Sequence, residues 1–135
     1  MIVAHESTDR ATVDTVEATL QLYFDGLYNS DTERLAQAFH RQAIYASATG
    51  GDLVHMTMPE YFAMVDGRPS PASRVERRTD NVVSIEFAGP VTALARVECS
   101  IGPKQFTDLL TLVHVDGHWQ IIAKVFHFEL EATRS

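Results

Sequence analysis

The chain has 135 residues, of which 45% are hydrophobic and 21% are charged, a composition typical of one globular domain. Eighteen acidic against eleven basic side chains give a formal net charge of −7. This charge argues against a nucleic-acid or membrane partner. Cys99 is the single cysteine, which excludes an internal disulfide framework. The first residues lack the pattern of a signal peptide, so we expect a cytoplasmic protein.

Helices are predicted in the first half of the chain, after a flexible N-terminal arm over residues 1–11. Apolar residues recur every three or four positions over residues 12–28, the pattern of an amphipathic helix. Ser30 and Glu33 fit a capping box at the start of a second, shorter helix. A strand over 43–48 and a short one over 53–56 should follow.

A third helix and a run of strands complete the prediction. Thr57 and Glu60 fit a capping box at the start of the helix. Residues 74–87, 91–101 and 105–127 then read as antiparallel strands. We therefore expect a single α+β domain over residues 12–130, with three helices packed on a strongly bent, mainly antiparallel sheet, and a tail over 131–135.

The last hairpin is predicted by Asp116-Gly117, a pair that favours a two-residue turn. If Val115 faces His118, then Phe106 faces His127 further along the strands. Asp108 and His127 would thus lie diagonally on one apolar face, within reach of each other. Continuing through the previous turn, Ile101 would face Phe106 and Cys99 would face Asp108.

The same register places small residues on the inner wall, and these leave room for a ligand. The alternative is that aromatic side chains fill the space. The residues expected to line a cavity are Tyr23, Phe24, Phe62, Cys99, Phe106, Leu110, Trp119, Ala123 and Val125.

Five segments carry a resemblance to a known family: Tyr23-Phe24-Asp25-Gly26-Leu27, Phe39-His40, Phe106-Thr107-Asp108, Val115-Asp116-Gly117-His118-Trp119-Gln120-Ile121 and Lys124-Val125-Phe126-His127. With the order of elements, they resemble the nuclear transport factor 2-like superfamily, and most closely its small bacterial group labelled "putative lumazine-binding", near the SnoaL-like polyketide cyclases. The resemblance implies a cystatin-like cone with an apolar cavity. The superfamily includes isomerases, dehydratases, epoxide hydrolases, cyclases and members without known activity, so the fold alone names no function.

Asp108 and His127 are the candidate catalytic pair, in which the carboxylate would orient an imidazole that shuttles protons. Asp108 alone could also serve as the acid or base. The competing interpretation is a buried pair with a structural role. Tyr45 is the preferred tyrosine to polarise a carbonyl, ahead of Tyr23 and Tyr28, although aromatic packing explains each of them as well.

No metal and no cofactor are expected, because the histidines lack ligand spacing and no phosphate-binding loop is present. Burial and the nearby Asp108 should raise the pKa of the Cys99 thiol, which is unsuited to a nucleophile.

The outer face of the last hairpin is too apolar for simple exposure, and it predicts a homodimer interface. Its residues are Thr107, Leu109, Thr111, Val113, Gln120, Ile122, Lys124 and Phe126.

Two classes of function follow from these observations. The first is a cofactor-free acid–base isomerase, cyclase or dehydratase acting on a small apolar carbonyl or polycyclic compound. The second is a non-catalytic module that binds a small ligand or organises partners through its dimer face. Solvent access to the cavity, together with a strongly shifted pKa of Asp108 or His127, would favour the first class, and a sealed or water-free pocket would favour the second or a purely structural role.

Overall fold

The computed structural model describes residues 10–131 of the chain, so most of the expected arm and tail lies outside the described residues. The helical elements are α1 (Arg10–Asn29), α2 (Thr32–Ala38), α3 (Met58–Asp66) and the 3-10 turn η2 (Ala72–Arg74). The strands are β1 (Phe39–Ser47), β2 (Val54–Thr57), β3 (Asn81–Phe87), β4 (Thr92–Ile101), β5 (Lys104–Val115) and β6 (His118–Leu130).

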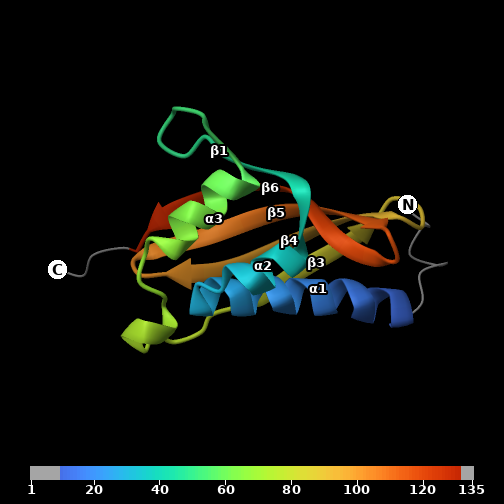
Figure 1. Ribbon diagram of the computed structural model, residues 1–135, viewed down its shortest axis with the longest axis horizontal. Helices are drawn as coiled ribbons and strands as arrows, with labels where there is room; N and C mark the ends of the chain where they lie inside the picture. The colour runs from blue at the N-terminus through green and yellow to red at the C-terminus, as the bar shows by residue number, and fades with distance from the viewer. Residues whose placement is uncertain (1–9, 132–135) are drawn as a thin grey trace.

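Three helices pack on a curled six-stranded sheet of order β2-β1-β6-β5-β4-β3, which confirms the α+β prediction. β1 lies parallel to β6, whereas the other neighbouring pairs are antiparallel. Figure 1 shows α1 running along the sheet, with α2 against α1 and α3 nearer β1. We call the space between the helices and the concave face of the sheet the cone. Among the described helices, none is long and apolar enough to cross a membrane.

The capping box predicted at Ser30 is wrong, and the end of α1 explains why. Ser30 has a φ of 48° and occupies the left-handed position that closes α1. The Ser30 amide donates to the carbonyl of Leu27, and the Asp31 amide donates to that of Gly26, the two bonds of a Schellman motif. Asp31 caps α2 instead, because its carboxylate accepts from the amides of the following turn. The box formed by Thr57 and Glu60 at α3 is confirmed.

The register of the last hairpin is correct only near its turn. Val115 pairs with His118 and Leu112 with Ile121, as predicted. A bulge then adds Ile122 to β6, so that Leu110 pairs with Lys124, and Asp108 with Phe126. Because side chains alternate between faces, one extra residue exchanges the faces of everything beyond it. Lys124 and Phe126 therefore point inward and are buried.

Two other strand predictions need correction. Ile101 pairs with Lys104, so the turn before β5 has two residues, and Cys99 faces Phe106 instead of Asp108. This shift of two positions leaves the faces unchanged. Residues 74–80 do not join β3, which begins at Asn81. They belong to a connection over 67–80, which we call the strap. It contains η2 and two prolines, neither of which can donate a backbone hydrogen bond to a sheet.

Candidate functional site

A small cavity of about 20 Å³ lies inside the cone, between α1, α3 and strands β1, β4, β5 and β6. This volume is enough for one water molecule. Its lining combines an apolar wall with four polar groups from different elements and two tyrosines, so it is the place where the fold gathers chemically active side chains. The lining residues are Leu27, Tyr45, Tyr61, Arg68, Cys99, Ile101, Phe106, Asp108 and Lys124.

Asp108 is completely buried and is held from the helix side. The hydroxyl of Tyr23 on α1 donates a hydrogen bond of 2.5 Å to Asp108 Oδ2. The other oxygen, Oδ1, is buried and has no hydrogen-bond partner among the described residues. Burial, and then the carboxylate, raise the pKa of Tyr23 well above its ordinary value, so this hydroxyl keeps its proton at neutral pH. Asp108 thus has one oxygen oriented and one available.

Lys124 is the residue that the sequence prediction missed. The bulge turns it into the cone, where it is 5% exposed. Its Nζ donates to the Tyr61 hydroxyl at 3.3 Å and lies 5.0–5.5 Å from the ring centres of Tyr23, Tyr45, Tyr61 and Phe126. Burial acts to lower the pKa of Lys124, but Tyr61 and Asp108 outweigh this and raise it. The side chain is therefore an ammonium, stabilised by aromatic faces and a carboxylate.

Tyr45 borders the same cavity, as its candidate role requires. It is 8% exposed and stacks on Tyr61 at 4.6 Å between ring centres. Burial raises the pKa of Tyr45, although the Lys124 ammonium opposes this effect. Burial, and then Asp108, raise the pKa of the Cys99 thiol to about 12, in agreement with the sequence prediction. Both groups are proton donors at neutral pH rather than nucleophiles.

These shifts predict a loss of stability in alkali. Tyr23, Cys99 and Lys124 all have a higher pKa in the folded protein, so the folded state binds their protons more tightly. Their contribution to stability is complete below the pKa values of the unfolded chain and is lost above them. Since an unfolded cysteine titrates near pH 8.5 and tyrosine and lysine near pH 10, urea unfolding should show a free energy that falls from about pH 8.5 upward.

Cys99→Ala is the control for the first part of this fall. Without the thiol, stability should stay level until about pH 10, where tyrosine and lysine begin to titrate in the unfolded chain. A wild-type free energy of unfolding that does not change between pH 8 and 10 would contradict the raised pKa of Cys99.

The predicted pairing of Asp108 with His127 is wrong. His127 follows the bulge, pairs with Thr107 and lies on the outer face, with a side chain that is 60% exposed. Its Nδ1 is 3.1 Å from the Thr49 hydroxyl, and its Nε2 is 3.6 Å from Glu129. The two side chains therefore point to opposite faces of the sheet, and Tyr23 holds the carboxylate where the imidazole was expected.

Of the other residues that were expected to line the cavity, some do so in the structure and some do not. Cys99 and Phe106 line the cavity, and Tyr23 binds Asp108. Ala123 and Val125 do not line it, because the bulge turns them outward; Val125 is 45% exposed. The remaining ones pack in the hydrophobic core or against it and do not border this cavity: Phe24, Phe62, Leu110 and Trp119. Aromatic side chains thus fill most of the cone, which is the alternative that the sequence left open.

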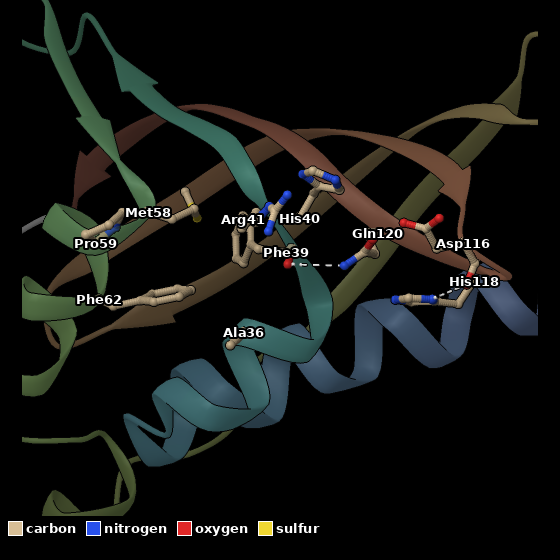
Figure 2. Close-up of a pocket in the computed structure, with 10 residues that line it drawn as sticks. All are labelled: Ala36, Phe39, His40, Arg41, Met58, Pro59, Phe62, Asp116, His118 and Gln120. Carbon is tan, nitrogen blue, oxygen red and sulfur yellow. Dashed lines mark hydrogen bonds between the residues drawn. The ribbon is translucent and has the colours of Figure 1, made fainter.

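A second and larger hollow of about 500 Å³ lies outside the cone, where β1 begins. Figure 2 shows it between α3 on one side and the turn joining β5 and β6 on the other. Its polar groups include Arg41 and His40 from β1 and His118 beside the turn. The His40 Nδ1 accepts from the Gln42 amide, so a neutral ring carries its proton on Nε2. We call this hollow the outer cleft.

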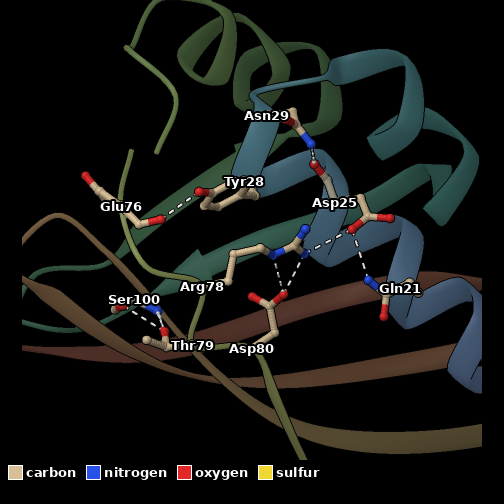
Figure 3. A network of polar contacts seen from close by, with 9 residues as sticks. All are labelled: Gln21, Asp25, Tyr28, Asn29, Glu76, Arg78, Thr79, Asp80 and Ser100. Atoms are coloured by element: carbon tan, nitrogen blue, oxygen red, sulfur yellow. Dashed lines mark hydrogen bonds and ion pairs between the residues drawn. The ribbon is translucent and has the colours of Figure 1, made fainter. Parts of the chain in front are cut away.

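The strap is fastened to α1 and β4 by polar contacts, which are drawn in Figure 3. The Tyr28 hydroxyl donates to the carbonyl of Glu76 at 2.6 Å. Arg78 lies over the Tyr28 ring and binds the carboxylates of Asp25 and Asp80. Thr79 and Ser100 hydroxyls are 2.7 Å apart. Arg68 lies at the start of the strap, where its amide donates to the carbonyl of Val65 in α3, and it lines the cavity.

The outer sheet face keeps an apolar patch, but with different members from those predicted. Lys124 and Phe126 are removed from it by the bulge, since both are buried in the cone. Leu109 pairs with Val125 across β5 and β6, and they are 41% and 45% exposed. Leu94 and Ile44, at 37% and 38%, lie on the neighbouring strands. We call these four residues the outer patch.

Solved structures with this architecture support the fold. An NTF2-like protein of unknown function from Shewanella baltica superposes with a TM-score of 0.80 at 22% identity, covering 91% of this chain and 98% of that one. A ketosteroid isomerase-like protein from Erwinia carotovora gives a TM-score of 0.69 at 10% identity, covering 89% and 98%. A curated relative, "Aldolase FrzH" from a Cladobotryum species, is 26% identical over 116 residues, which are 84% of this chain and 89% of that protein.

The cone of helices on a curled sheet is that of the nuclear transport factor 2-like superfamily, as the sequence predicted. The family model described as "Putative lumazine-binding" matches residues 11–127, and the chain belongs to that family.

Proposed function

We propose that this protein is a cofactor-free acid–base enzyme that moves a proton next to the carbonyl group of a small, mainly apolar compound. The observation that carries the proposal is a fully buried carboxylate with one unpartnered oxygen, in the same cavity as a buried ammonium. Unsatisfied buried polar groups are costly, and a few polar groups that converge on one cavity with an apolar wall are typical of binding and active sites.

Each group in the cavity has a distinct role in this proposal. Asp108 Oδ1 accepts the proton from the carbon beside the carbonyl, the electron pair of that bond forms a carbon–carbon double bond, and the π pair of the carbonyl moves onto its oxygen, which becomes the enolate oxygen. Lys124 stabilises this oxygen by donating a hydrogen bond, assisted by Tyr45 or Tyr61. Tyr23 fixes the carboxylate through Oδ2. Return of the proton to the same or another carbon gives exchange or isomerisation, and elimination gives dehydration.

The similar proteins support this class of chemistry. One relative carries the name aldolase, and one structure is called ketosteroid isomerase-like. Aldol and isomerisation reactions both begin by removing a proton beside a carbonyl group. Schiff-base formation, the other route to an aldol reaction, needs an unprotonated amine. Because the pKa of Lys124 is raised, we favour an ammonium that donates over an amine that attacks.

A second candidate function is favoured by the small size of the cavity. A site of about 20 Å³ cannot hold a substrate unless side chains or the strap move. A non-catalytic module, in which the polar cluster only shapes a binding site or stabilises the fold, fits this observation directly. The two functions differ in whether the bound compound loses a proton, and this can be measured.

The experiment is proton exchange in deuterium oxide, followed by NMR on a panel of aryl ketones that includes methyl 3-benzoylpropanoate. We expect the wild type to accelerate exchange beside the carbonyl, and Asp108→Asn to abolish the acceleration. Tyr23→Phe, which keeps the carboxylate, should reduce it. His127→Ala is the matched control on the outer face and should exchange like the wild type. No exchange above the Asp108→Asn rate for any ketone would favour the binding module and overturn the enzyme.

We also propose that the protein is a homodimer joined through the outer patch. Four exposed aliphatic side chains on adjacent strands are an unusual surface for a monomer. Light scattering at micromolar concentration should give twice the mass of the chain, and Leu109→Glu should give the mass of one chain. A wild-type monomer would rule out this assembly.

A further inference from the structure

The charges around the cone cavity do not balance. Two cations line it, Lys124 and Arg68, against one carboxylate, Asp108. A second carboxylate, Asp80, is close enough for its negative charge to contribute to the raised pKa of Cys99. Asp80 is already bound by Arg78, with oxygen–nitrogen distances of 2.9 and 2.5 Å. The cavity and its rim therefore carry one positive charge in excess.

Arg68 has no anion of its own. Its Nε is buried without a hydrogen-bond partner, and among residues 10–131 no carboxylate lies within ion-pair distance of its guanidinium. Arg68 as a whole is half-buried, but its Nε has lost contact with water without gaining an acceptor, which is costly for a charged group. Glu76, the acidic residue of the strap that lies before Asp80, is already bound to Arg74 and the Gly102 amide.

We infer that the ligand of the cone carries a carboxylate in addition to its carbonyl group, and that Arg68 binds this carboxylate while the carbonyl faces Lys124. This inference rests on the proposed function, since it names the substrate class of the same site. A planar guanidinium matches a carboxylate with two parallel hydrogen bonds. A ligand with one negative charge neutralises the excess positive charge of the cavity, whereas a phosphate dianion would leave an excess of negative charge. The substrate class that we infer is therefore a keto acid with an apolar body.

The outer cleft offers the competing place for an anion. Arg41 lines that cleft, and among residues 10–131 no carboxylate lies within ion-pair distance of its guanidinium. The cleft, however, has the Asp116 carboxylate among its own lining residues. Its cation is also solvent-exposed, where pairing contributes little. Arg41 is therefore the matched control for Arg68.

The test is calorimetric titration with 3-benzoylpropanoate and its methyl ester, which share the aryl ketone and differ in the negative charge. The wild type should bind the acid roughly ten- to a hundredfold more tightly than the ester, the range of a charge-assisted hydrogen bond. Arg68→Gln should bind acid and ester with similar affinity, because it loses the ten- to hundredfold advantage of the acid. Arg68→Lys should keep part of the preference, and Arg41→Gln should keep all of it.

Several results would overturn the inference: equal binding of both compounds by the wild type, binding of neither, or loss of the preference in Arg41→Gln alone. Melting temperatures within a few degrees of the wild type establish that the variants are folded. The inference and the proposed function fail separately. Asp108-dependent exchange of the ester without a preference for the acid rejects the inference alone, and a preference without exchange rejects the enzyme alone.

Discussion

We expect Lys124→Met to lower the free energy of unfolding by about 3 kcal/mol, the upper end of the usual range for one substitution, because it removes the ammonium that shares a cavity with the buried Asp108 carboxylate. Methionine keeps an unbranched chain of similar length, so the main loss is the positive charge. Asp108 then keeps the hydrogen bond from Tyr23 and the half-buried Arg68 in the lining of the cavity, but no fully buried cation. Urea unfolding at pH 7 measures the loss.

Lys104→Met is the matched control. Lys104 is exposed, and its Nζ lies 4.7 Å from the ring centre of Phe128, so it also has an aromatic contact but no buried charge nearby. Its replacement should cost less than about 1 kcal/mol. Lys124→Met with Asp108→Asn should be less damaging than the sum of the two changes, since each removes the partner of the other. Additive losses, or equal losses for the two lysines, would contradict a buried electrostatic pair.

Features set by neighbouring residues could be predicted from the sequence. The Thr57 box is formed by side chains three residues apart, and the hairpin turn by two adjacent residues. Such local signals hold wherever the tertiary structure agrees with them. Ser30 shows the limit of such signals. Serine is a favoured N-cap residue, but in the structure Ser30 occupies the left-handed position that closes the preceding helix, α1.

The candidate site was predicted only in part, because the sequence prediction did not include the bulge in β6. Asp108 faces inward as expected, because nothing interrupts β5 between the turn and this residue. His127 and Lys124 exchange faces, because Ile122 is added to β6. The signal was present in the aromatic pattern: Trp119 is at an odd position, whereas Phe126 and Phe128 are at even positions. A change of parity in an apolar strand indicates a bulge.

Arg68 could not be predicted as part of the site. It lies on the strap, where the sequence has no periodicity, and its amide donates to the carbonyl of Val65 at the end of α3. The sequence does not show against which part of the sheet α3 packs, so it does not show what the Arg68 side chain reaches. The polar cluster therefore combines residues whose positions follow from strand alternation with one whose position depends on the packing of α3 against β1.

Deleting Ile122 should remove the bulge of β6 without changing the faces of the residues that follow. These residues keep the partners that they already have, because Ala123 pairs with Thr111 and Lys124 with Leu110. Side chains then alternate regularly from the turn onward, so Lys124 stays in the cone. We expect a loss of roughly 1–3 kcal/mol for one half-buried isoleucine, with a cooperative melting transition by circular dichroism.

Ile122→Ala separates the bulge from the side chain. It shortens the same residue but keeps the extra position, so it should melt cooperatively, with a loss of roughly 1–3 kcal/mol for a half-buried isoleucine. If the deletion abolishes cooperative melting and Ile122→Ala keeps it, the cone needs the bend and twist that a bulge gives a strand, and not only the side chain of Ile122. The inward position of Lys124 would then depend on the bend of β6 as well as on the alternation of its side chains.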